Sequence, residues 1–208
     1  MTTTRPYAGP RADIGVIGGS GLYSLLDGET VEVDTPWGPP SDPLTIAEVA
    51  GRRVAFVPRH GRDHRFPPHR VNYRANLWAL RAVGVRQVLG PCAVGSLRAD
   101  QGPGTLVVPD QLVDRTWGRG HTFYDDPGSV VHVAFADPYC PNGRRVALSA
   151  GRQLGLVGHD LGCQSQTQKV AVGEGAKHGP LGLVLHRLIL ASTGTTVPLT
   201  SQRRGVMI

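Results

Sequence analysis

The chain has 208 residues, of which 40% are hydrophobic and 18% charged, so it can bury a core and is not compositionally disordered. Its 28 glycines and 17 prolines are too many for a helical bundle and favour an α/β protein with many turns. No apolar run approaches the roughly 20 residues of a membrane span, and the first residues show no signal-peptide pattern. Three cysteines without a Cys-x-x-Cys pair favour a reducing compartment. We therefore expect a cytoplasmic protein with no membrane partner.

The positive charge of the chain is concentrated in one place. The formal net charge is +6, and residues 51–75 hold seven arginines and one aspartate, so this window alone carries an equal excess. A nucleic-acid binder spreads basic residues along a face and interleaves aromatic ones, whereas a small-anion site concentrates them near a loop with free backbone N–H groups. The cluster is short and is broken by Gly61, Pro67 and Pro68. We favour an anion site and expect no nucleic-acid partner; a solvated arginine-rich surface loop is the plain alternative.

Apolar patterns predict five strands, at residues 14–17, 44–49, 53–58, 85–89 and 105–108, with a turn opened by Gly51. Between the third and fourth of them, Asn72 can cap a helix over residues 73–83, with Leu77 and Leu80 on one side. Gly84 is placed to end this helix. Strands that alternate with a helix predict an α/β fold whose mixed, mostly parallel central sheet is flanked by helices.

Three loops follow predicted strands, and in such sheets ligands bind beyond the carboxyl ends of the strands. The first, Gly18-Gly19-Ser20-Gly21, can offer backbone N–H groups and a hydroxyl to an anion. It is neither the dinucleotide fingerprint nor a Walker loop, and alone it could be a tight structural turn. The second begins with Arg59, which can hold phosphate with two parallel N–H bonds, and His60, which can add a donor.

The third loop, at residues 92–96, has small side chains. Ala93 and Gly95 would let a flat ring or a sugar approach the backbone, although a close-packed turn with Cys92 as a buried thiol is equally consistent. Zinc is the remaining alternative, because His60 and His64 would share one face of a helix. The glycine and prolines of this segment argue against that helix, so we expect no metal.

The character of the chain changes near residue 164. From there to residue 208 the only acid is Glu174, and both lysines of the chain lie in this stretch, whereas every basic residue before it is arginine. This seam predicts an α/β domain over residues 1–163 and a tail of different character over residues 164–208.

Seven ordered blocks in the first 150 residues resemble one family, the trimeric purine nucleoside phosphorylases, and most closely the 5′-methylthioadenosine phosphorylases. They are Ile14-Gly15-Val16-Ile17-Gly18-Gly19-Ser20-Gly21-Leu22, Asp34-Thr35-Pro36-Trp37-Gly38, Arg59-His60-Gly61-Arg62-Asp63-His64, Val71-Asn72-Tyr73-Arg74-Ala75-Asn76, Ala93-Val94-Gly95-Ser96-Leu97, Pro109-Asp110-Gln111-Leu112-Val113-Asp114-Arg115-Thr116 and Ala136-Asp137-Pro138-Tyr139-Cys140-Pro141. The resemblance implies a pentosyltransferase of purine salvage. Such an enzyme cleaves 5′-methylthioadenosine or a related purine nucleoside with inorganic phosphate, giving the free base and a ribose 1-phosphate. Phosphate is then a co-substrate, and no cofactor or metal is needed.

The resemblance also implies roles for single residues. For phosphate these are Ser20, Arg59, His60, Cys92 and Ala93. Ala93, Gly95 and His132 are implied for the nucleoside, and His132 corresponds to a histidine that reaches the 5′ end of the sugar in a neighbouring subunit. The expected assembly is therefore a homo-oligomer, a trimer. Cys92 departs from the hydroxyl residue of the family, and a thiol is a poorer hydrogen-bond donor.

The end of the chain departs from the family further. After Gly162 the sequence has no Glu-Gly-Pro-Arg-Phe-Ser-like segment, no Met-Thr segment and no aspartate pair that grips the purine. We expect an incomplete fold there, arising from a frameshift, an altered gene end or a replaced tail, and the catalytic acid is not assigned. Two alternatives stay open: a general purine nucleoside or 5′-methylthioinosine phosphorylase, and an impaired remnant that only binds phosphate.

Overall fold

The computed structural model describes residues 6–19, 27–92, 94–101, 105–120, 122–128, 130–153 and 158–160. Contacts divide the chain into two compact units, and each is described by itself. The first contains the described residues up to Pro91 together with those of Thr116–Val131. The second contains the described residues of Cys92–Arg115 and those from His132 onward. The predicted boundary between residues 163 and 164 lies outside the described residues.

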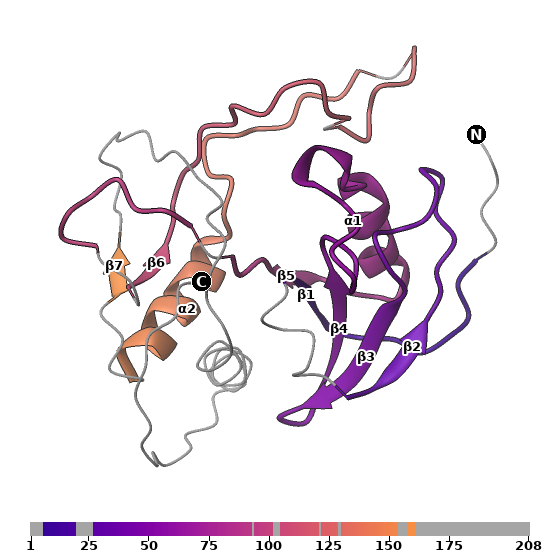
Figure 1. Ribbon diagram of the computed structural model, residues 1–208, viewed down its shortest axis with the longest axis horizontal. Helices are drawn as coiled ribbons and strands as arrows, with labels where there is room; N and C mark the ends of the chain where they lie inside the picture. Colours follow the sequence, from indigo (N-terminus) through magenta and orange to yellow (C-terminus); the bar gives the residue numbers. More distant parts are fainter. Residues whose placement is uncertain are drawn as a thin grey trace. The chain divides into compact units, whose positions relative to one another are not determined.

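The first unit is built on a five-stranded sheet (Figure 1). Its strands, in spatial order, are β2 (Glu29–Val31), β3 (Leu44–Val49), β4 (Arg52–Pro58), β1 (Ile14–Gly18) and β5 (Gln87–Leu89). The pairs β2–β3 and β3–β4 are antiparallel, whereas β4–β1 and β1–β5 are parallel. The predicted mixed α/β sheet is confirmed, and its parallel part is the β4–β1–β5 portion. Because these three strands run the same way, their carboxyl ends leave the sheet at one edge.

The antiparallel hairpin β3–β4 is closed by the turn that Gly51 predicts. Ala50 and Gly51 both have positive φ, 53° and 73°. Two consecutive left-handed residues make the hairpin turn whose twist matches that of the flanking strands. Only glycine adopts this conformation without cost.

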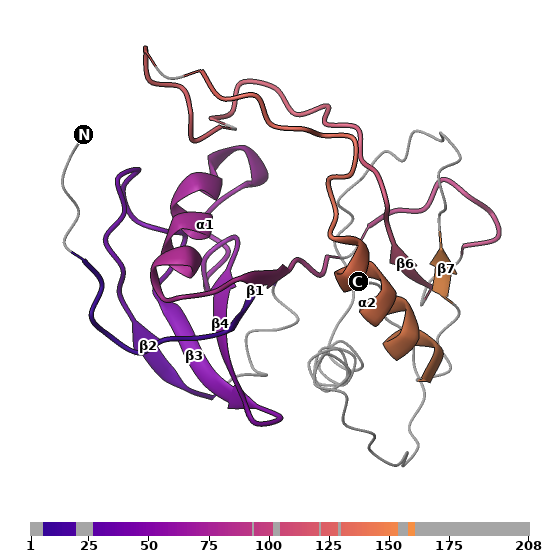
Figure 2. The same cartoon turned by 180° about the vertical axis from the view of Figure 1, so that it is seen from behind.

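Helix α1 (Tyr73–Ala82) supplies the apolar stripe that covers the sheet. Its buried Ala79 and Leu80 join a core cluster with Val57 of β4 and Leu44 of β3. Figure 2 shows this helix and the sheet from behind. The predicted helix is confirmed to within one residue, but Leu77 is 41% exposed while Leu80 is buried. The buried stripe runs through residues 75, 76, 79, 80 and 83, so Leu77 lies at its margin.

The ends of α1 follow the predicted capping. The Asn72 side chain accepts a hydrogen bond from Ala75 N at 3.2 Å, which satisfies one of the free N–H groups of the first turn. At the other end Gly84 has φ +100°, the left-handed conformation that commonly ends helices.

In the second unit a two-stranded parallel sheet pairs β6 (Leu106–Val108) with β7 (Gly158–Asp160). Helix α2 (Pro141–Gln153) packs on β6 through Leu148, which contacts Leu106 and Val108 (Figure 1). A Cβ on Gly151 would come within 2.7 Å of the Leu106 side chain, so this glycine allows the close approach. None of the helices in the described part of the chain combines the length and apolarity needed to cross a membrane.

Candidate functional site

Two of the three predicted loops start side by side at the carboxyl edge of the first unit's sheet. Strands β1 and β4 are paired in parallel up to Gly18 and Pro58. Just beyond them the Arg59 backbone N–H donates to the Gly18 carbonyl at 3.0 Å. The glycine loop and the arginine loop therefore leave the sheet from hydrogen-bonded positions. Ser20, two residues further on, lies outside the described residues.

Arg59 and His60 are half-buried, and their side chains are hydrogen-bonded to each other. The Arg59 Nε–H donates to His60 Nε2 at 3.2 Å. His60 Nδ1 lies 2.8 Å from the Phe66 carbonyl oxygen, which can only accept, so Nδ1 carries the proton. This contact fixes the ring tautomer, and His60 orients the arginine. Among the described residues the terminal Nη atoms of Arg59 have no hydrogen-bond partner, so they can face an anion.

The segment that follows is a set of tight turns. Gly61 N donates to Pro58 O at 2.9 Å and His64 N donates to Gly61 O at 3.1 Å. Gly61 and His64 have φ of +78° and +56°. The expectation that no helix links His60 to His64 is confirmed. The two rings are instead stacked, with centroids 5.9 Å apart, and the part of the chain that is described contains no group of three or more metal-ligating side chains.

Part of the charge of the basic window is neutralised by acids. Arg62 and Arg65 both approach the Asp42 carboxylate, and Arg74 pairs with Asp125 at 2.6 Å. Paired arginines are less available to a polyanion. Arg59, at the carboxyl end of β4, has none of these ion pairs, and this favours a local anion site over a broad basic face.

The other predicted site residues lie in the second unit or outside the described residues. Cys92 is a free, half-buried thiol in the second unit. Gly95 and His132 are exposed. Ala93 lies outside the described residues. The structure thus brings together Arg59, His60 and the start of the glycine loop. The roles of all the predicted site residues, these included, stay predictions.

Burial raises the pKa of the Tyr139 phenol above its ordinary value, and the neighbouring Cys92 adds to the shift. This is an environment effect in the second unit, where a charged phenolate is disfavoured by loss of hydration. Deprotonation of this phenol therefore needs a higher pH than that of a solvent-exposed tyrosine.

Sequence reasoning missed an aromatic cluster that joins distant segments of the first unit. The ring of Trp37 meets Trp78 and Phe123 edge to face, at centroid distances of 5.2 and 5.0 Å. Arg74 lies over the Trp37 ring and donates to the Thr122 carbonyl at 3.2 Å. These contacts hold Thr122 and Phe123 against Trp37 and α1. The spacing of Trp37 and Trp78 along the sequence does not indicate that their rings are in contact.

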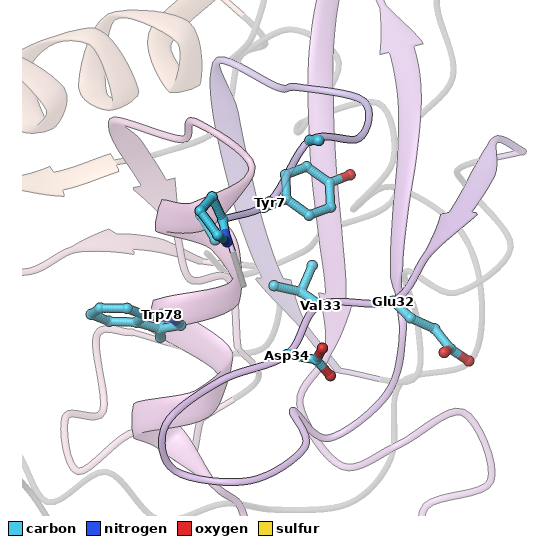
Figure 3. Close-up of a pocket in the computed structure, with 8 residues that line it drawn as sticks. Tyr7, Glu32, Val33, Asp34 and Trp78 are labelled. Carbon is cyan, nitrogen blue, oxygen red and sulfur yellow. The ribbon is translucent and has the colours of Figure 1, made fainter. Parts of the chain in front are cut away.

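A separate cavity of about 390 Å³ lies between the N-terminal segment, the residues after β2 and α1. Figure 3 shows Trp78 projecting from α1, with Tyr7, Val33 and Asp34 on the neighbouring segments. Tyr7 donates to the Pro10 carbonyl at 2.9 Å. None of the predicted site residues lines this cavity.

Comparison with known proteins gives a consistent result. The family model described as the phosphorylase superfamily matches residues 13–176. A purine nucleoside phosphorylase of Streptomyces coelicolor is 67% identical over 150 residues, covering 68% of this chain and 54% of that protein. An S-methyl-5′-thioadenosine phosphorylase of Mycolicibacterium smegmatis is 61% identical over 136 residues, covering 64% and 52%.

Solved structures of the same family are also similar to this chain. Methylthioadenosine phosphorylase from Schistosoma mansoni, in complex with adenine, matches with 40% identity and a TM-score of 0.65, covering 69% of this chain and 54% of that one. The chain spans about half the length of the curated relatives it matches. With its mixed sheet and the paired loops at the sheet's edge, the chain belongs to the phosphorylase superfamily.

Proposed function

We propose that this protein is a phosphorylase of purine nucleosides that uses inorganic phosphate to cleave 5′-methylthioadenosine or a related nucleoside. The products are the free purine and the corresponding ribose 1-phosphate. The observation that carries the proposal is the junction of the glycine loop with Arg59 and His60 at the carboxyl edge of the sheet. The names of the relatives, purine nucleoside and S-methyl-5′-thioadenosine phosphorylases, support this substrate class.

The proposed reaction forms a bond between a phosphate oxygen and C1′ as the bond between C1′ and the purine nitrogen breaks. The departing purine takes the bonding electrons and needs a proton from an acid, which this chain's described residues do not identify. Phosphate must be desolvated and aimed at C1′, and the Arg59 guanidinium and backbone N–H groups are suited to both tasks. The bound anion then stabilises the positive charge that develops on the sugar.

The remaining assignments extend the proposal. In line with the resemblance, we assign Ser20, Cys92 and Ala93 to phosphate, and Ala93, Gly95 and His132 to the nucleoside. We propose that phosphate is the nucleophile and a co-substrate and, as the resemblance implies, that no metal or organic cofactor takes part.

We also propose a homo-oligomer, a trimer in line with the resemblance. The segment around His132 exposes a run of apolar side chains, with Val130 83%, Val133 69% and Phe135 55% exposed. Contiguous exposed apolar residues of this kind mark interaction surfaces. A cytoplasmic location fits the free thiols of Cys92 and Cys140.

The proposal is tested with the purified chain by measuring release of purine from 5′-methylthioadenosine and from inosine at varied phosphate concentrations. Phosphate-dependent release is the expected result. The variant Arg59→Ala should weaken phosphate use by more than about tenfold, because it removes a charge-assisted contact. An unchanged phosphate dependence would remove Arg59 from the site. Phosphate binding without turnover would favour the alternative of a phosphorylase that only binds the anion.

A further inference from the structure

Asp42 is nearly buried, with only 8% of its surface exposed, and it lies two residues before β3. A buried carboxylate is costly unless charges and hydrogen bonds compensate it. Its Oδ2 accepts the Arg62 backbone N–H at 2.8 Å and an Arg65 Nη2–H at 3.4 Å, and Oδ1 lies 3.8 Å from Arg62 Nε. Both carboxylate oxygens therefore face the loop that begins with Arg59.

The two arginines also bind back to the segment that carries Asp42. Arg62 donates to Thr45 Oγ1 and Arg65 donates to the Ser41 carbonyl, each at 2.9 Å. Ser41 is itself anchored: its backbone N–H donates to Asn76 Oδ1 at 2.8 Å, and Asn76 Nδ2 donates to Ser41 Oγ at 2.9 Å. Asn76 is 1% exposed. The carboxylate is thus tied through Ser41 to the buried face of α1.

The residues held by Asp42, 62–65, are followed directly by Phe66, whose carbonyl oxygen orients the His60 ring. Phe66 N donates to His60 O at 3.0 Å, and the Phe66 carbonyl accepts from His60 Nδ1 at 2.8 Å. The other ring nitrogen, Nε2, holds Arg59. A displacement of residues 62–65 would move Phe66 and release the ring.

We propose that Asp42 is a positioning residue, whose buried carboxylate holds residues 62–65 so that the Phe66 carbonyl fixes the His60 tautomer and His60 aims Arg59 at phosphate. Asp42 touches neither phosphate nor nucleoside and acts through the loop. The inference rests on the proposed function for its phosphate part, and its effect on the His60 ring can be measured without any ligand.

The chain contains a matched control for this carboxylate. Asp63 also contacts Arg65, with its Oδ2 3.6 Å from Nη1, but its side chain is 62% exposed whereas that of Asp42 is 10% exposed. Asp42→Asn and Asp63→Asn remove the same charge beside the same arginine. They differ in whether the carboxylate is buried and bound to the Arg62 backbone.

The test measures phosphate affinity by titration calorimetry and the His60 tautomer by nitrogen-15 NMR of the imidazole ring, on the full chain. We expect Asp42→Asn to raise the phosphate Kd at least about fivefold and to populate both tautomers in the ligand-free protein. Asp63→Asn should change the Kd less than about twofold and leave one tautomer. Wild-type values of both quantities in Asp42→Asn would overturn the inference, as would equal effects of the two variants.

A second pair keeps the test decisive if Asp42→Asn does not fold. Arg65→Met removes the contacts to Asp42 and Ser41 from a side chain that is 48% exposed, together with those to Asp63 and the Phe66 ring. Arg70→Met removes the same charge from an exposed position. We expect a threefold or larger rise in Kd and a mixed tautomer only for Arg65→Met. Indistinguishable variants would overturn the inference.

Failure of the proposed function gives a different result. If wild-type protein and Arg59→Ala bind phosphate equally weakly, the phosphate role is wrong. A tautomer that still changes in Asp42→Asn would then support the positioning of His60 by Asp42, and an unchanged tautomer would overturn it.

Discussion

The basic loop of the first unit and the irregular segments of the second unit hold their candidate residues in different ways. Arg59 and His60 are half-buried and bonded to each other and to the Phe66 carbonyl. Gly95 and His132 are exposed and lie outside the described helices and strands, apart from the short bridge at Gly95. The first region places its functional side chains with its own hydrogen bonds. In the second, both residues are exposed to solvent, and their roles stay predictions.

The largest expected effect tests the buried anchor of the first region. Asn76→Ala leaves the backbone N–H and hydroxyl of Ser41 without their partner inside the core. We expect the free energy of unfolding to fall by about 2–3 kcal/mol, measured by urea denaturation. Asn142→Ala, at an exposed position in the second unit, should change it by less than about 0.5 kcal/mol. If the free energy of unfolding fell by a similar amount in both variants, the two regions would not differ in how firmly their residues are held.

A second experiment compares one histidine from each region. His60→Ala removes the side chain that orients Arg59, so phosphate Kd should rise about fivefold or more. His132→Ala should change phosphate Kd less than about twofold, because the resemblance assigns it to the 5′ end of the sugar. Titration calorimetry with inorganic phosphate alone gives both values. A larger loss in His132→Ala would show that the second region takes part in holding the anion.

A smaller effect is expected at Cys92. Replacement by threonine supplies a hydroxyl, which is a stronger hydrogen-bond donor than a thiol. We expect Cys92→Thr to keep the phosphate Kd or to lower it by about twofold. Cys140→Thr, which replaces another free thiol, serves as the control. A tenfold loss of affinity in Cys92→Thr would show that this position has been misinterpreted.

The smallest effect concerns pH and the second unit alone. Burial raises the pKa of Tyr139 above its ordinary value of 10.0, with a further contribution from Cys92. The folded chain then keeps a proton that the unfolded chain loses, so the associated stability is present below pH 10 and is lost as pH rises through the folded-state pKa. In urea denaturation followed across that range, Tyr139→Phe should lose stability less steeply than wild type. Parallel curves would show that burial does not hold the phenol neutral.

The parts that could be predicted from the sequence are those decided by local chemistry. Asn72 and Gly84 mark the ends of α1, Gly51 marks the hairpin turn, and apolar runs mark β1, β3 and β4. The position of Arg59 and His60 at the end of β4 followed from the apolar run before them, whereas the hydrogen bond between their side chains was not predicted. These features depend on a few neighbouring residues, so a short stretch of sequence contains them.

The missed parts depend on tertiary contacts. Helix α2 contains Gly143 and Gly151, which weaken its helical signal, and it packs on β6 through Leu148. Asp42 looked like an ordinary loop acid, and its burial depends on arginines that lie 20 and 23 residues away. Partners so far apart along the chain cannot be predicted from the spacing of residues.

The hydrogen bond from Arg59 N to Gly18 O bears on which substitutions the protein can tolerate. The separation of the two loop origins is the ordinary spacing of neighbouring strands, about 4.8 Å, and it is maintained by the backbone rather than by any side chain. Side chains elsewhere in the sheet and loops can be substituted without disturbing it. Substitutions in the neighbouring residues can therefore leave the spacing of the two loop origins unchanged, provided that β1 and β4 keep their register.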